Sequence, residues 1–262
     1  MSLIVSGHQP TYLPWLGLFH KISLADVFVV MDDAQYLDQD WNNRNRLKGT
    51  NGPFWLTVPV EKPLPSAKAV RDIRIDAAVG WGSSRHWQIR HWKSIELCYR
   101  NAPFWERHAP ALAELYTQRQ FRWLCEVDHQ LLLLFLEALD LKTRLVISSE
   151  VGFSGRKSEL VLDHAVRLKA SICVLGINGR SYVVEDDFIR AGVSLYFQDY
   201  RHPVYPQRFG GFVSHLSALD LLMNCGPRSR EILCGGNIDK SFLLRETVPG
   251  PRRIEEHGDG DE

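Results

Sequence analysis

The first 31 residues alternate between short apolar runs and polar loops, and this order predicts two strands joined by a helix. Residues 3–7 form a β-branched run that ends in glycine, and residues 27–31 form a second apolar run. Between them, residues 15–25 place apolar side chains at helical spacing, and Pro14 suits the first turn of a helix. A strand, a helix and a second strand within roughly 30 residues are typical of a right-handed crossover between parallel strands.

The pattern further along the chain predicts helices first and then a return to the sheet. Residues 81–141 repeat apolar positions at three- and four-residue spacings, which indicates three or four helices. Apolar runs at 143–150, 171–176 and 193–200 then alternate with amphipathic stretches. This β-α-β-α-β order favours an α/β fold with a doubly wound, mainly parallel sheet, of Rossmann-like or nucleotidylyltransferase-like type, that carries a helical insertion.

The same segments predict how the chain is organised. Residues 54–60 are expected to add a third strand near the start, and residues 73–77 a short edge strand. The predicted segments are 1–80 and 142–248 for the two parts of the α/β core, 81–141 for the helical insertion and 249–262 for the tail. Dense charge and few apolar residues predict that the tail is disordered.

Composition limits the classes of partner. The chain has 31 lysine and arginine residues against 31 aspartate and glutamate residues, so no net charge steers it toward nucleic acid or anionic membranes. No long apolar run predicts a membrane span, and no signal peptide is expected. The five cysteines are scattered and form no C-x-x-C pair, which is typical of a reducing compartment. We therefore predict a cytoplasmic protein that neither binds nucleic acid nor inserts into membranes.

Polar residues gather where the first two predicted strands end. His8 and Gln9 follow the first strand, and Asp32, Asp33 and Gln35 follow the second. Because ligands of parallel α/β sheets bind beyond the carboxyl ends of the strands, we expect the active site here. Histidine suits proton transfer at neutral pH, and an aspartate could act as a base, orient a histidine or bind an amine. A divalent cation and a solvated strand end are the alternatives for the carboxylates, and we assign no metal site.

The polar run that begins at Trp41 is the second candidate. Arginine offers a rigid fork for carboxylate or phosphate, and asparagine amides add directional donors and acceptors. This mixture favours small-anion binding over a solvated loop, and the neutral charge disfavours nucleic acid. The residues assigned to substrate binding in this run are Trp41, Asn43, Arg44 and Asn45.

A third set of candidates lies in the second half of the chain. His202 and Tyr205 follow the last predicted strand in a proline-rich loop, so His202 is a second candidate acid or base. Ser217 and Asp220 share a face of a closing helix predicted over 215–225, where a helix cap explains them equally well. Further candidate substrate contacts are aromatic or cationic side chains with polar neighbours: Tyr12, Trp15, Lys93 and Tyr99.

Four segments carry a resemblance to a known family: GHQPTYLPW (7–15), DWNNRNRLK (40–48), FWLTVPV (54–60) and YRHPVYPQ (200–207). Over residues 3–230 the chain resembles the bacterial WbqC-like protein family. That family is associated with O-antigen and related glycan gene sets and with small-molecule biosynthesis, and some members are described as glycyl or aminoacyl transferases. The resemblance therefore implies acyl or aminoacyl transfer.

The resemblance and the residues together favour a transferase that forms an amide or an ester. The acceptor would be a sugar nucleotide or another small molecule, and an acyl or peptidyl carrier protein is a candidate partner. His8 or His202 would remove the acceptor proton, while Arg44 with its neighbouring asparagines would hold an anionic donor. No P-loop, dinucleotide-binding or nucleophile-elbow motif is present.

Two alternatives stay open. One is an ATP-dependent adenylate-forming or nucleotidyl-transfer enzyme, in which ATP is the only cofactor implied. The chain lacks the His-x-Gly-His element of nucleotidylyltransferases, which counts against it. The other is a non-catalytic subunit that binds a substrate or a carrier.

Overall fold

Five parallel strands form the central sheet of the computed structural model, which describes residues 2–62 and 68–246; the tail predicted at 249–262 lies outside the described residues. The strands are β1 (Ile4–His8), β2 (Val27–Val30), β5 (Arg144–Ile147), β6 (Ile172–Gly176) and β7 (Ser194–Gln198). Their order is β5-β2-β1-β6-β7, so the chain adds strands on one side of β1 and then on the other. This reversal beside β1 is the doubly wound arrangement that the sequence predicts.

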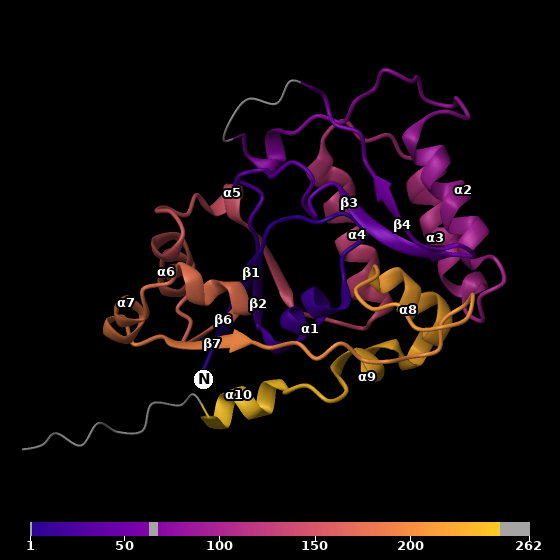
Figure 1. Cartoon of the computed structure of the whole chain (residues 1–262). Coiled ribbons are helices and arrows are strands. Elements are labelled where there is room, and N and C mark those ends of the chain that lie inside the picture. The colour runs from indigo at the N-terminus through magenta and orange to yellow at the C-terminus, as the bar shows by residue number, and fades with distance from the viewer. Residues whose placement is uncertain (1, 63–67, 247–262) are drawn as a thin grey trace, which may run out of the picture.

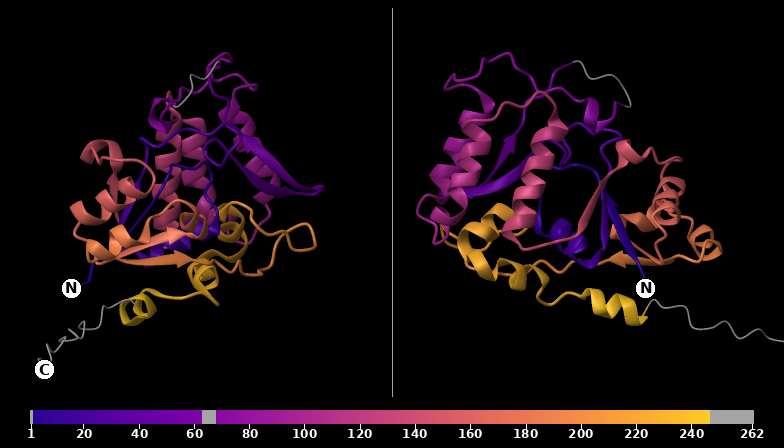
Figure 2. Two further views of the ribbon diagram at one scale, coloured as in Figure 1. Left: turned by 60° about the vertical axis from the view of Figure 1, so that its left-hand side comes forward. Right: turned by 180° about the vertical axis from the view of Figure 1, so that it is seen from behind.

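Helices cover both faces of the sheet (Figures 1 and 2). On one side lie α1 (Leu16–Leu24) and α10 (Lys240–Glu246), with α9 (Ser229–Cys234) against α1. On the other side lie α6 (Ser158–Arg167) and α7 (Glu185–Arg190). Alternate strand residues explain this layering, since successive side chains of a strand point to opposite faces. Ile4 and Val174 pack with α1 and α10, whereas Val5 and Cys173 pack with α6 and α7.

The chain between β2 and β5 builds the right-hand part of Figure 1. It contains the hairpin β3 (Arg44–Gly49) and β4 (Gly52–Thr57), and the helices α2 (Trp87–Tyr99), α3 (Trp105–Thr117) and α4 (Leu124–Ala138). These elements share one apolar core with α1 and with α8 (Ala218–Cys225). Three short elements, η1 (Val70–Asp72), η2 (Ile177–Ser181) and η3 (Gly226–Arg228), and the single-turn α5 (Ser148–Val151) complete the described fold.

Two predicted strands differ from the structure. Residues 54–60 do not join the main sheet, because a tight turn closed by Gly49 and Gly52 folds β4 back onto β3 as an antiparallel hairpin. Gly52 adopts φ +98°, which glycine tolerates and most residues do not. Residues 73–77 make only isolated bridges, Arg74 with Trp123 and Ile75 with Val60, so no edge strand forms there.

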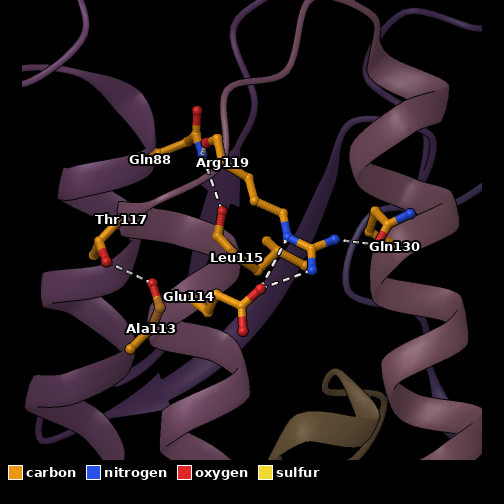
Figure 3. A network of polar contacts seen from close by, with 7 residues as sticks. All are labelled: Gln88, Ala113, Glu114, Leu115, Thr117, Arg119 and Gln130. Atoms are coloured by element: carbon orange, nitrogen blue, oxygen red, sulfur yellow. Dashed lines mark hydrogen bonds and ion pairs between the residues drawn. The ribbon is translucent and has the colours of Figure 1, made fainter.

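A polar network fixes α4 against α2 and α3 (Figure 3). Arg119, in the connection that leaves α3, contacts Glu114 on α3 and donates to Gln130 on α4 at 2.8 Å. Gln88 on α2 donates to the carbonyls of Leu115 and Arg119, at 3.3 and 2.8 Å. Its side chain is fully buried, so these bonds satisfy an amide nitrogen that water cannot reach, whereas Oε1 of Gln88 has no partner among the described residues. None of the helices in the described part of the chain has the length and apolar character needed to cross a membrane.

Candidate functional site

The loop that leaves β1 places His8 at the carboxyl edge of the sheet. The Nδ1 atom of His8 lies 2.9 Å from the carbonyl of Gln9, so Nδ1 carries the proton and Nε2 keeps its lone pair. No described residue donates to Nε2. Burial, followed by the charge on Lys21, lowers the pKa of His8 to about 3. His8 is therefore uncharged at neutral pH and presents a free acceptor nitrogen.

Asp128 on α4 faces the same edge and is 1% exposed. It lines a small pocket together with His8, Gln9, Thr11 and His129. Neither carboxyl oxygen of Asp128 has a hydrogen-bond partner among the described residues, and the buried hydroxyl of Thr11 has none either. Burial raises the pKa of Asp128 well above its usual range. The pocket thus contains unsatisfied polar atoms, which in folded proteins are uncommon enough to require an explanation.

Asp32 and Asp33 bind the first turn after β5. Asp32 accepts from the backbone N–H of Ser149 at 2.9 Å and from its hydroxyl at 2.6 Å. The hydroxyl of Ser148 donates to Asp33 at 2.8 Å. These bonds join the ends of β2 and β5 and use three of the four carboxyl oxygens; the fourth, Oδ1 of Asp33, has no partner within residues 2–62 and 68–246. The negative charge of Asp32 also reaches His129, whose pKa burial lowers and Asp32 helps to raise.

Asn42, Asn43 and Asn45 point into the protein, where their side-chain amides donate hydrogen bonds to backbone carbonyls. Asn43 donates to the carbonyl of Val58 at 2.9 Å, and Asn45 donates to the carbonyl of Leu13 at 2.6 Å. Both side chains are buried. Asn42 donates to the carbonyl of Pro10 and to the side chain of Gln9, at 2.8 and 3.2 Å. The amides of Asn42 and Asn45 therefore hold the loop that carries His8, whereas Asn43 holds the segment after β4 and its Oδ1 has no partner among the described residues.

An aromatic row runs outward from His8. Its ring centroid lies 5.2 Å from Trp15, Trp15 lies 5.6 Å from Trp41, and Trp41 lies 5.6 Å from Trp55. At the outer end Arg44 and Arg46 lie over Trp55, at 4.5 and 5.7 Å from its centroid. Arg44 and Arg46 are two residues apart on β3, so their side chains lie on the same face of the strand, and both contact the ring of Trp55. The row joins a free histidine nitrogen to a pair of guanidinium groups.

The family of the chain is shown by comparison with known proteins. The model of the WbqC-like protein family matches residues 9–232. The chain belongs to the WbqC-like protein family. It is also similar to the uncharacterized protein Rv1507c of Mycobacterium tuberculosis (strain ATCC 25618 / H37Rv), with 33% identity over 226 residues that cover 86% of this chain and 95% of that protein. No solved structure gives a significant match. The resemblance inferred from the sequence motifs is thus confirmed.

Several predicted site residues of this WbqC-like protein lie in its interior. Tyr12 is fully buried and its hydroxyl lies 2.7 Å from Nδ1 of His91 and 2.5 Å from the hydroxyl of Tyr116. Tyr99 is equally buried and donates to Asp220 at 3.0 Å. These hydrogen bonds join the His8 loop to α2 and α3, and α2 to α8.

The loop after β7 is held by a buried lysine. Lys48 on β3 donates to Gln207 and to the carbonyls of Gly210 and Gly211. Asp220 lies beside this lysine and beside Tyr205; burial raises the pKa of Asp220 and the charge of Lys48 lowers it. This group forms a buried cluster that packs the 207–211 loop against the hairpin.

His202 has both ring nitrogens engaged with backbone. Its Nδ1 lies 2.9 Å from the carbonyl of Pro203, and its Nε2 accepts from the backbone N–H of His215 at 3.2 Å. Ser217 is fully buried and caps α8 by accepting from the backbone N–H of Leu219. Of the two histidines considered as a base, only His8 has a free lone pair.

Two candidates lie away from these groups, and several contributing residues were not predicted. Gln35 is exposed in the loop after β2, where it forms an isolated bridge with Ala69, and Lys93 is exposed on the outer side of α2. Among the described residues no group of three or more histidine, cysteine, aspartate or glutamate side chains could hold a metal ion. The unpredicted residues at the site are Thr11, Arg46, Trp55, Asp128 and His129. Asp128 did carry a signal, since it lies one turn from Leu124 and one turn from Leu132 on a buried helix face.

Proposed function

We propose that this WbqC-like protein transfers an acyl or aminoacyl group to an amine or hydroxyl acceptor and forms an amide or an ester. The observation that supports this proposal best is the aromatic row between the free nitrogen of His8 and the guanidinium groups of Arg44 and Arg46. An elongated donor with an anionic end could lie along this row, with its carbonyl near His8. Aromatic faces bind sugar rings and nucleobases, and arginines bind phosphate.

In this proposal the acceptor nitrogen or oxygen attacks the donor carbonyl carbon, and Nε2 of His8 takes the acceptor proton. The tetrahedral intermediate then breaks its bond to the leaving group, for example a thiolate, which receives that proton from His8. A pKa of about 3 makes His8 a weak base toward a free acceptor. It suits an acceptor whose proton becomes acidic as the new bond forms, as happens when a neutral amine adds to a carbonyl.

Two features of the site make His8 preferable to the other predicted acid–base residues. The ring nitrogens of His202 are both bound to backbone, so His202 could accept a proton only after losing a bond. Asp32 is committed to Ser149 through both carboxyl oxygens. We therefore assign His202 and Asp32 to holding their loops in place.

The test is mass spectrometry of products from the purified protein with two kinds of donor. One is a carrier-bound aminoacyl thioester without ATP, and the other is a free amino acid with ATP; glucosamine and a sugar nucleotide serve as acceptors. Thioester-dependent product that is lost in His8→Gln supports the proposal. Product that requires ATP would favour adenylate formation instead. No product with any donor, despite donor binding, would favour a non-catalytic binding subunit.

The arginines are tested separately from the base. Arg44→Ala combined with Arg46→Ala is expected to raise the KM for an anionic donor at least tenfold with a smaller effect on kcat, because the guanidinium groups bind the donor away from the reacting carbonyl. Arg107→Ala is the matched control, since Arg107 is an exposed cation on α3 that belongs to no part of the aromatic row. An equal KM for both variants would contradict donor binding along the row.

A further inference from the structure

The pocket between the His8 loop and α4 has an unusual chemical lining. We call it the Asp128 pocket; its polar lining residues are His8, Gln9, Thr11, Asp128 and His129. The enclosed space has room for a single group of about the size of a water molecule. Asp128 and Thr11 are buried, whereas His8, Gln9 and His129 are partly exposed. The buried residues therefore form its floor, and the partly exposed residues form its mouth.

Asp128 has no positive partner in the part of the chain that the structure describes. It forms no ion pair there, and both of its oxygens are without a hydrogen bond. The titratable groups near Asp128 are Tyr12, Tyr36, Tyr116, Cys125 and His129, with His8 across the pocket. Apart from the two histidines, whose pKa values burial lowers, this set includes no base and no cation. A buried carboxyl group without a cation is costly in its charged form, so it is a place where a cationic ligand is stabilised.

The unpaired atoms at the pocket are hydrogen-bond acceptors. Asp128 offers two carboxyl oxygens, Thr11 offers a hydroxyl oxygen, and His8 offers Nε2 because its Nδ1 proton is directed to Gln9. A hydroxyl and a protonated carboxyl group can also donate, but the ionised carboxylate of Asp128 and the ring nitrogen of His8 can only accept. An ammonium group has three donors and no acceptor, and its size matches the pocket. An ammonium group therefore matches the Asp128 pocket in charge, in the number of hydrogen bonds it can donate, and in volume.

We propose that the Asp128 pocket binds the protonated amino group of a primary amine, with Asp128 as its counter-ion and with the two Asp128 oxygens and the Thr11 hydroxyl as acceptors for its three N–H groups. In the context of the proposed function, on which this part rests, the amine is the α-amino group of the aminoacyl donor, which takes no part in the bond changes and leaves Nε2 of His8 free for the acceptor proton. The rest of that substrate leaves the pocket between His8 and His129 toward Trp15. The binding site itself is argued from the described side chains and holds for a catalytic or a non-catalytic protein.

Amine binding changes the protonation of Asp128. Burial raises the pKa of Asp128 well above its usual range and so favours its protonated form before the amine arrives. Binding of an ammonium group favours the carboxylate, so Asp128 gives up its proton to solvent as the ion pair forms. Binding at neutral pH is therefore expected to release about one proton for each amine bound.

The experiment is isothermal titration calorimetry of the full chain with methylammonium chloride at pH 7. It is done in two buffers of different ionisation enthalpy, at fixed ionic strength with sodium chloride. We expect saturable binding of one methylammonium with release of about one proton. Asp128→Asn, which keeps the size of the side chain, is expected to weaken binding roughly tenfold or more and to abolish proton release. Tetramethylammonium, which has no N–H donor, is not expected to bind.

Controls separate the pocket from general charge effects. Glu137→Gln removes an exposed carboxylate from the same helix and should leave binding unchanged. Thr11→Val should weaken binding without changing the number of protons released, and it provides a second variant if Asp128→Asn fails to fold. Absence of methylammonium binding, or binding that Asp128→Asn retains in full, would overturn the proposal. Binding without any product in the transfer assay would leave the amine site standing and refute the proposed reaction alone.

Discussion

Replacing Tyr12 with phenylalanine tests whether a buried hydrogen-bond chain holds the loop that carries His8. The Tyr12 hydroxyl lies between Nδ1 of His91, at 2.7 Å, and the hydroxyl of Tyr116, at 2.5 Å. Burial lowers the pKa of His91 to about 3, so its ring is neutral and has one acceptor nitrogen. The backbone of Thr57 takes the other ring nitrogen, so Nδ1 accepts from Tyr12 and Tyr12 accepts from Tyr116.

The expected magnitude follows from counting the groups left without partners. Tyr12→Phe deprives a buried acceptor on His91 and a buried donor on Tyr116, each at about 1–3 kcal/mol, so we expect a loss of about 3 kcal/mol in the free energy of unfolding. Tyr116→Phe removes one bond but leaves Tyr12 donating to His91, so its cost is about 1 kcal/mol. The double variant should cost less than the sum by about 1 kcal/mol or more, because Tyr116 then no longer leaves an orphaned donor.

The assay is equilibrium unfolding in urea, followed by circular dichroism and by tryptophan fluorescence. If the m-value is the same for the wild type and the variants, their free energies of unfolding can be compared directly. The reasoning would be refuted if Tyr12→Phe and Tyr116→Phe cost the same, or if the double variant showed simple additivity. Either result would mean that Tyr12 does not bridge the two partners.

Three further predictions concern stability. Lys48→Met should cost about 2 kcal/mol, because it removes the hydrogen bonds that a buried ammonium group donates to Gln207 and to the carbonyls of Gly210 and Gly211. Lys62→Met, which breaks an exposed ion pair, should cost under about 0.5 kcal/mol, and the urea midpoints of the two variants test the difference. Gly226→Ala should lower the melting temperature, because a Cβ would lie 2.3 Å from the Phe104 ring at φ +50°, and an unchanged value would contradict this contact. Stability should fall as pH drops from about 6.5 toward 3, since the unfolded chain protonates His8 first, and His8→Gln should make that fall shallower.

The parallel sheet could be predicted because its strands are buried on both faces and read as continuous apolar runs. The four residues of β2 are all buried, and β6 has the same character over four of its five. The hairpin could not be found in this way. β3 reads as a polar run, since Arg44 and Arg46 point outward while Asn45 points inward and satisfies the carbonyl of Leu13. A polar residue on the inner face hides the alternation that identifies a half-buried strand.

Of the candidate site, the residues that directly follow a predicted strand could be located from the sequence. His8 follows a predicted strand, and its place at the sheet edge comes from local pattern alone. Whether its nitrogen is free depends on which carbonyl lies beside the ring, and the same uncertainty led to His202 being ranked beside it. Asp128 lies far along the chain on α4, and only tertiary packing brings that helix over the β1 loop.

The helices between the hairpin and β5 are therefore part of the site and not an attachment to it. His8 belongs to the sheet, but the carboxyl group it faces belongs to α4, and α4 is held by Arg119 and packs in the same core as α1. Tyr12 ties the His8 loop to α2 and α3 through its hydroxyl. A substitution at Tyr12 should consequently change the stability of the fold and, through α3 and the Arg119 contact with Gln130 on α4, the distance between His8 and Asp128. Tyr12 and Tyr116 are 104 residues apart in the chain, so one buried hydroxyl joins the His8 loop to α3 across a long stretch of sequence.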